Sequence, residues 1–313
     1  MSSAGGRGEF PACLVYSDGY YADIGAHVFP MVKFALTRRL LLAEGWATPP
    51  DFVEPEPATD ADVLRVHSAD YVRKLTAGTL SPLEILTLEL PWSPELTRAS
   101  WLCAGGTLLA SKIALATGFA ANLAGGFHHA FPDHGEGFCV LHDPAIALRA
   151  LLAAGEIRRA AVLDLDVHQG NGTACIFAAD PSVFTCSIHQ EDNYPAVKPP
   201  SDLDLGLPTG ADGRAYGRAL DQAIPAVLAQ EPELLVYIAG ADPYIEDQLG
   251  GLALTRGDLA ERDRRVFEAA ASRAVPVVVL PAGGYAREMA DTVAIHATTV
   301  RLGLAQLRAG SPQ

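Results

Sequence analysis

The stretch Ala160–Gly172 constrains this chain more than any other. It reads AAVLDLDVHQGNG, in which an apolar run typical of a buried strand ends in Asp164, Asp166 and His168 and then in a Gly-Asn-Gly turn. Side chains alternate between the two faces of a strand, so three residues at this spacing should project to one side. Two carboxylates and an imidazole on a hydrophobic strand are costly unless they are paired or bound to a metal. A helix cap would need only one acid, so the pattern favours a divalent-metal site.

Composition narrows the class of protein. The chain has 313 residues and a formal net charge of −14, which argues against direct nucleic-acid binding through a basic surface and remains compatible with a basic peptide partner. Five cysteines without a CxxC pair indicate reduced thiols rather than disulfides or a cysteine zinc site. We find no hydrophobic signal core and expect no apolar stretch near the roughly 18 residues of a membrane helix. These features predict a cytoplasmic protein that does not bind a membrane.

Apolar runs suited to buried strands alternate with helical patterns along most of the chain. This order predicts one α/β domain over residues 11–309, with a mostly parallel central sheet covered by helices on both faces in three layers. Residues 1–10 are small and polar and are expected to be flexible. Residues 80–94 are expected to be irregular, and residues 190–208 to form a long functional loop. Helices are expected over 31–44, from Thr59 to Tyr71, and over 94–115, 143–154, 212–230, 258–273 and 293–307.

Unusual polar residues follow the later strands, where parallel sheets form their sites. These residues are His128 and His129, Asp166 and His168, His189, Asp242, and Tyr285. Any one of them could be an ordinary loop residue or a packed side chain. Five strand ends of this kind would meet at one edge of the sheet, and together they predict a single polar site there.

The residue types in that predicted site indicate a reaction. Asp166, His168 and Asp242 form a charge-balancing set for a divalent metal such as zinc, with a position left for water. The tandem histidines behind Gly-Gly are suited to take a proton from water and return it to a leaving amine. Tyr285 could donate to a developing oxyanion. With no GxSxG elbow and no P-loop, the pattern favours metal-assisted hydrolysis of an amide-like bond.

Four segments, taken together, resemble a known family. They read LAGGFHHAFPDHGEGFC, LDLDVHQGNGT, AGADPYIEDQLGG and PAGGYA, and they look like the successive active-site motifs of the zinc-dependent histone deacetylase superfamily, which has the arginase–deacetylase fold. The similarity runs in matching order from about His27 to the last predicted helix. The DVHQGNG turn and the early HVFPMVKF segment look most like class IV and its bacterial relatives.

The resemblance implies one Zn²⁺ per chain and a role for each matching residue. The implied zinc ligands are Asp166, His168 and Asp242. His129 matches the general base and acid, His128 its electrostatic partner, and Tyr285 the residue that polarises the substrate carbonyl.

Two further residues match the partners of the histidines. Asp164 matches the carboxylate that holds His128, and Asn171 stands where the partner of His129 is found. Some branches carry aspartate at this second position, and a neutral amide should favour the His129 imidazolium less, which could alter the pH optimum.

A structural K⁺ or Na⁺ is also implied, held by Asp164, Asp166, His168, Ser187 and the carbonyl of Ile188. The residues that match the substrate channel are Gly137, Phe138, Tyr194, Gly283 and Gly284. Ala282 departs from the glycine triplet usual before the tyrosine.

The leading hypothesis is therefore a zinc-dependent deacylase that converts an N-acyl-lysine, in a protein or peptide, or a related acylated amine, into a carboxylate and a free amine. Two alternatives remain. An arginase-like ureohydrolase would bind two manganese ions, which requires more ligands than the motifs supply. A non-catalytic acyl-lysine-binding protein would be expected to lack some catalytic positions. The motifs leave open the acyl-chain length, the choice of zinc or iron, and the oligomeric state.

Overall fold

The fold is built on an eight-stranded, all-parallel sheet with the order β2-β1-β3-β8-β7-β4-β5-β6. The computed structural model describes residues 12–310, so the expectation for residues 1–10 lies outside the described residues. The strands are β1 Leu14–Val15, β2 Phe52–Val53, β3 Phe119–Asn122, β4 Ala160–Asp164, β5 Val183–Gln190, β6 Leu203–Leu207, β7 Leu234–Ile238 and β8 Val277–Leu280.

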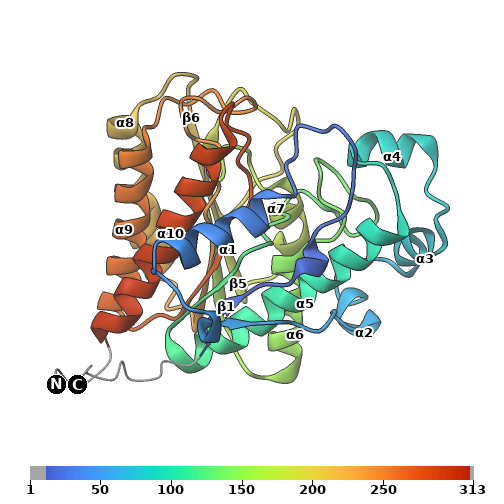
Figure 1. Cartoon of the computed structure of the whole chain (residues 1–313), viewed down its shortest axis with the longest axis horizontal. Helices are drawn as coiled ribbons and strands as arrows, with labels where there is room; N and C mark the ends of the chain where they lie inside the picture. Colours follow the sequence, from blue (N-terminus) through green and yellow to red (C-terminus); the bar gives the residue numbers. More distant parts are fainter. Residues whose placement is uncertain (1–11, 311–313) are drawn as a thin grey trace.

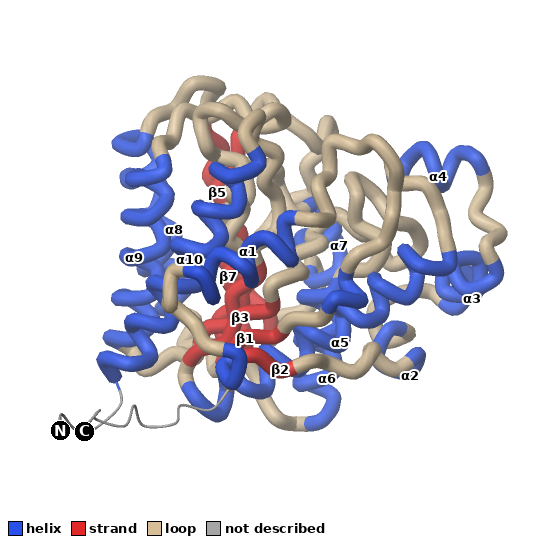
Figure 2. Tube along the Cα trace, in the orientation of Figure 1, coloured by secondary structure: helices blue, strands red, loops and turns tan. Residues whose placement is uncertain are grey.

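Helices cover both faces of this sheet (Figures 1 and 2). One layer contains α1, α8, α9 and α10, and the other contains α5, α6 and α7. The helices are α1 Lys33–Ala43, α2 Asp60–Val63, α3 Ala69–Ala77, α4 Pro82–Leu88, α5 Pro94–Thr117, α6 Asp143–Ala154, α7 Asn171–Phe177, α8 Gly213–Leu228, α9 Arg256–Ser272 and α10 Met289–Gly310. The predicted single-domain, three-layer α/β architecture is confirmed. All residues of the four central strands are buried, which explains why their sequences are apolar except for the terminal Asn122 and Asp164.

Several predicted boundaries were wrong for local reasons. Residues 80–94 contain α4, because Ser81 and Glu84 form a capping box and Pro82 occupies the first turn, where proline is favoured. The helix expected from Thr59 is two helices, and Ser68 caps the second through the Tyr71 amide. The long loop after β5 ends in the edge strand β6.

The start of α9 and the nature of α5 also differ from expectation. Helix α9 begins at Arg256, two residues before the expected start at residue 258, because Thr255 is its N-cap. Helix α5 is long and apolar enough to span a membrane, with a mean hydropathy of 1.3 in its 18-residue window, so the expectation that no stretch approaches this length was too strict. Over half of that window is buried in the protein, as expected for a core helix.

The polar segments of the sequence leave the sheet at its carboxyl edge. Strand β4 ends at Asp164, so Asp166 and His168 lie in the turn after the strand rather than on it. The alternation of side chains along a strand therefore applies only to Asp164. The turn after β4 brings Asp166 and His168 together.

Candidate metal centre and active site

Three of the predicted site residues form a compact buried group. Asp166 and His168 follow β4, and Asp242 follows β7, which pairs with β4 in the sheet. Their potential ligand atoms all lie within 4.8 Å of one another, and all three residues are buried. Sheet pairing therefore joins residues that are more than seventy positions apart in the sequence.

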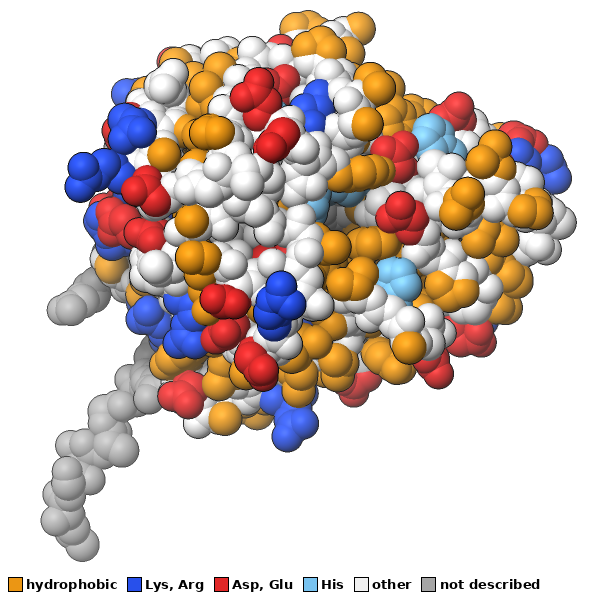
Figure 3. Space-filling model, turned by 90° about the horizontal axis from the view of Figure 1, so that it is seen from above, with side chains coloured by type: hydrophobic (Ala, Val, Ile, Leu, Met, Phe, Trp, Pro, Cys, Tyr) orange, Lys and Arg blue, Asp and Glu red, His pale blue; other side chains and the backbone are white. Residues whose placement is uncertain are grey.

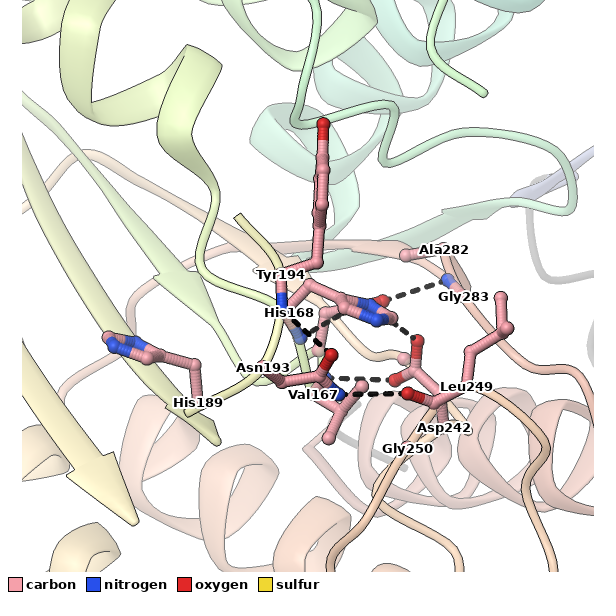
Figure 4. A network of polar contacts seen from close by, with 12 residues as sticks. Val167, His168, His189, Asn193, Tyr194, Asp242, Leu249, Gly250, Ala282 and Gly283 are labelled. Carbon is pink, nitrogen blue, oxygen red and sulfur yellow. Dashed lines mark hydrogen bonds and ion pairs between the residues drawn. The ribbon is translucent and has the colours of Figure 1, made fainter. Parts of the chain in front are cut away.

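Backbone amides orient the two carboxylates of this group (Figure 4). Gly283 N donates to Asp166 Oδ2 at 2.9 Å, and Val167 N donates to Asp242 Oδ1 at 2.9 Å. The other oxygens face His168, whose Nδ1 lies 3.1 Å from Asp166 Oδ1 and 3.4 Å from Asp242 Oδ2. Asp242 Oδ2 is buried and accepts no hydrogen bond, and such an acceptor needs a partner.

The charges of the group favour a cation. Burial, with a contribution from Asp166, raises the pKa of Asp242 to about 7. Burial opposes protonation of His168, but Asp166 and Asp242 outweigh it and raise its pKa to about 10. Glycine makes the space: a Cβ on Gly283 would lie 2.0 Å from Asp242 Oδ2. Two buried carboxylates and one imidazole, with an acceptor left unpaired, fit a divalent metal ion.

The tandem histidines follow β3 and lie beside this group. Their ring centroids are 4.0 Å apart, and the His129 ring is 5.9 Å from that of His168. His128 Nδ1 bonds Asp164 Oδ2 at 2.6 Å, whereas His129 Nδ1 bonds Asn171 Oδ1 at 2.7 Å. The structure thus gives each histidine the partner that the sequence predicts.

The surroundings of the two imidazoles place them in different charge states. Burial opposes protonation of His128, but the carboxylates of Asp164 and Asp166 raise its pKa to about 9. Burial and the neighbouring histidines hold the pKa of His129 well below its usual value. His129 is therefore the neutral imidazole of the pair, and a neutral imidazole is what a general base must be.

Tyr285 follows β8 and lines the same cavity as both histidines, Asp166 and His168. Its backbone N–H donates to Asp247 Oδ2 at 2.6 Å, which anchors the loop. Burial raises the pKa of its phenol well above the usual value, so the hydroxyl remains a proton donor.

Three of the predicted channel residues, Gly137, Phe138 and Gly283, line this cavity. Gly137 and Phe138 both have left-handed φ values, of 52° and 67°. A Cβ on Gly137 would lie 2.9 Å from the His129 ring and 3.1 Å from that of Tyr194, so only glycine fits between them. The Tyr194 ring is 5.0 Å from that of His129. Gly283 lines the cavity beside Ala282, and Gly284 follows in the same loop. Figure 3 shows a hollow with histidine side chains inside it and hydrophobic side chains around it.

The residues predicted to hold a monovalent cation lie on two neighbouring strands and the turn after them. Asp164 pairs with Ser187 in the β4–β5 register, and Ile188 follows. Ser187 Oγ lies 2.9 Å from His189 Nδ1. His189 itself was expected to join the site, but Figure 4 shows it directed away from His168 and Asp242.

Two charged residues near the site were missed from the sequence. Lys33 is buried, donates from Nζ to the Ala282 carbonyl at 2.7 Å and lies 5.3 Å from the Tyr285 ring centroid. Ala282, the departure from the glycine triplet, has a left-handed φ of 54°. The second missed residue, Glu136, bonds Asn171. The sequence signal that could have identified Lys33 is a lysine inside the apolar run FPMVKF. No comparable sequence signal points to Glu136.

A family model for the histone deacetylase domain matches residues 27–301. The chain belongs to this family. It is 43% identical to an uncharacterised protein of Picosynechococcus over 90% of this chain and 95% of the relative. It is 30% identical to Histone deacetylase 2 of Arabidopsis thaliana over 94% of this chain and 80% of the relative. The crystal structure of an HDAC homologue complexed with SAHA superposes with a TM-score of 0.81 at 24% identity, covering 97% of this chain and 86% of the other, which shows a shared fold.

Proposed function

We propose that this chain is a zinc-dependent amidohydrolase that removes the acyl group from N-acyl-lysine or a related acylated amine. One observation carries the proposal: Asp166 and His168, two members of the buried group that Asp242 completes, line one cavity with a neutral histidine and a protonated tyrosine. The family membership and the deacetylase name of the Arabidopsis relative support the same reaction class.

The metal contributes one part of the chemistry. Held by Asp166, His168 and Asp242, Zn²⁺ would supply Lewis acidity to the substrate carbonyl and to the attacking water. A second metal site has no support in residues 12–310, where this is the one group of three or more potential ligands that could hold an ion. That observation favours a mononuclear deacylase over a binuclear arginase-like enzyme.

The remaining steps belong to the side chains of this protein. His129 takes a proton from the water as oxygen adds to the carbonyl carbon. The Tyr285 hydroxyl donates to the developing oxyanion. When the C–N bond breaks, His129 returns the proton to the amine, and a carboxylate and a free amine leave. His128 stays positively charged and stabilises negative charge close to the reaction.

The same proposal extends to the substrate channel and to a structural cation. Phe138 and Tyr194 would form walls along an acyl-lysine side chain, and Gly137 leaves space between Tyr194 and His129. A K⁺ or Na⁺ would lie at Asp164, Ser187 and Ile188 with the neighbouring turn. Assignment to the class IV branch remains a prediction from the DVHQGNG turn.

A turnover panel tests this function. Purified zinc-loaded protein is assayed on lysine peptides of graded acyl length and on acetylpolyamines, with and without a chelator, and Asp242→Asn serves as the matched control. We expect hydrolysis of at least one substrate, loss with the chelator, recovery on zinc addition, and none with Asp242→Asn. Hydrolysis that resists chelation, or none anywhere on the panel, would contradict the proposal.

A further inference from the structure

Glu136 is linked to His129, the proposed proton-transfer residue, through the side chain of Asn171. Its Oε1 accepts hydrogen bonds from Asn171 Nδ2 at 2.7 Å and from the Tyr194 hydroxyl at 2.5 Å. Its Oε2 lies 3.2 Å from His134 Nε2. The carboxylate is mostly shielded, with 19% of the side chain exposed. One acid therefore contacts both the partner of His129 and a wall of the channel.

Two contacts determine which end of the Asn171 amide faces His129: Glu136 accepts from the NH₂ group at 2.7 Å, and the Gly172 N–H donates to the oxygen at 3.1 Å. A carboxylate can only accept hydrogen bonds, so the Asn171 NH₂ group must point toward Glu136. The amide oxygen then faces His129, where it lies 2.7 Å from Nδ1. An amide oxygen can only accept, so His129 must carry its proton on Nδ1. This leaves the lone pair on Nε2, the nitrogen that a general base uses.

The contact with Tyr194 ties the same carboxylate to the channel. The Tyr194 ring packs edge-on against that of His129, at 5.0 Å between centroids. Tyr194 lies on the long loop after β5, and Glu136 belongs to the segment that follows the tandem histidines. Glu136 thus joins two segments that are far apart in the sequence and meet around His129.

We infer that Glu136 is a positioning residue that fixes the tautomer of His129 through the Asn171 amide and holds Tyr194 against the same ring. The inference rests on the proposed function, because it assigns His129 the role of base. It also explains how the neutral Asn171 can serve as the partner of His129: the carboxylate that orients the pair belongs to Glu136, which contacts Asn171 rather than His129. Loss of a residue that supports a metal ligand typically costs about 10- to 100-fold in affinity or activity, and we expect a loss of this order for a residue that supports His129.

Three variants test the inference as a set. Glu136→Ala should lower kcat about 10-fold or more, because only the Gly172 N–H then orients the Asn171 amide, and its NH₂ group can turn toward His129 in part of the molecules. Asn171→Asp should also be impaired, since it places a second carboxylate against Glu136. Combining the two should restore kcat above that of Asn171→Asp alone, because an aspartate accepts the Nδ1 proton in either orientation and the repulsion is gone. A combined variant no faster than Asn171→Asp alone would overturn the inference.

A spectroscopic readout separates this inference from the proposed function. Histidine-selective ¹⁵N NMR, with His129→Gln to assign the resonance among nine histidines, reports the tautomer whether or not the protein turns over substrate. We expect the Nδ1–H form in the wild type, a detectable Nε2–H form in Glu136→Ala, and the Nδ1–H form again in the combined variant. A Glu136→Ala spectrum with the wild-type tautomer would overturn the inference, whereas an inactive wild type with the expected tautomers would overturn only the deacylase assignment.

Two control variants distinguish an effect on the orientation of the Asn171 amide from a general effect of negative charge near the site. Glu136→Gln keeps an oxygen that can accept from both Asn171 and Tyr194, so its tautomer should match the wild type. Asp133→Asn removes a carboxylate from the other side of His134, where Asp133 bonds Nδ1 at 2.8 Å with 76% of its side chain exposed. That variant should retain wild-type kcat. A tenfold loss in Asp133→Asn would show that charge at the rim, and not orientation of Asn171, explains the effect of Glu136.

Discussion

His128 and His129 are neighbours in sequence and in space, yet the protein gives them opposite properties. His128 bonds the buried Asp164 carboxylate directly, and its pKa rises to about 9. His129 bonds the neutral Asn171 amide, and burial holds its pKa well below the usual value. Both rings are buried, so the difference arises from the charges around them: two carboxylates, Asp164 and Asp166, act on His128, whereas His129 has a neutral amide partner and lies beside two other histidines. The carboxylates favour a positive charge on His128, and the amide leaves His129 neutral and able to accept a proton.

The largest effect should separate the two histidines by activity. His129→Gln removes the group that moves the proton, so we expect kcat to fall on the order of 10³-fold, within the usual range for acid–base catalysis. His128→Gln removes a stabilising charge and should cost less, about 10- to 100-fold. Both are measured by steady-state kinetics on protein with equal zinc content. A larger loss in His128→Gln would reverse the assignment.

Tyr285→Phe provides a reference that involves neither histidine. Removing one oxyanion donor typically lowers kcat by about 10² to 10³. The variant should bind zinc as the wild type does and keep the same pH dependence, because both histidine partners are intact. Wild-type turnover would remove Tyr285 from the mechanism.

Asp164→Asn gives His128 the same kind of partner that His129 has, and so removes the contrast between them. The pKa of His128 should fall, because the carboxylate of Asp164 is a principal cause of its rise. We expect about 10- to 100-fold lower activity and a neutral His128 near pH 7 by ¹⁵N NMR. An imidazolium that persists at pH 7 would show that Asp166 alone holds the charge.

The smallest effect concerns stability in the chelator-treated protein. The folded pKa of His128 lies above the unfolded value, so its stabilisation is fully present below about pH 6.5 and is lost as pH rises through about 9. The folded pKa of His129 is depressed, so this residue instead destabilises the protein as pH falls below about 6.5. Each pKa unit corresponds to about 1.4 kcal/mol in the free energy of unfolding.

Denaturant unfolding from pH 5 to pH 9 measures both effects. The free energy of unfolding of the wild type should exceed that of His128→Gln by less and less as the pH rises toward 9. Compared with His129→Gln, the wild type should lose stability as the pH falls toward 5. Slopes of the same sign for the two variants would contradict the contrast in charge.

Much of the fold and the site could be predicted because the signals are local. Apolar strands that are followed closely by Asp166, Asp242 or Tyr285 indicate a parallel sheet whose polar edge is a site. The short helix α4 was missed although its Ser81–Glu84 capping box is also a local signal, because prolines were read as breaks. Lys33 and Glu136 were not predictable in this way. Lys33 bonds a residue 249 positions away, and Glu136 acquires Asn171 and Tyr194 as partners only when the start of α7 and the loop after β5 fold against the segment that follows the tandem histidines.

A zinc titration followed by activity tests the central claim most directly. Chelator-treated protein is titrated with Zn²⁺ while hydrolysis of the best panel substrate is recorded, beside Asp242→Asn. We predict that activity rises from zero and saturates at one zinc per chain, and that Asp242→Asn neither binds this zinc tightly nor hydrolyses the substrate. Saturation at two metals per chain, or full hydrolysis by Asp242→Asn, would contradict a single metal held by Asp166, His168 and Asp242.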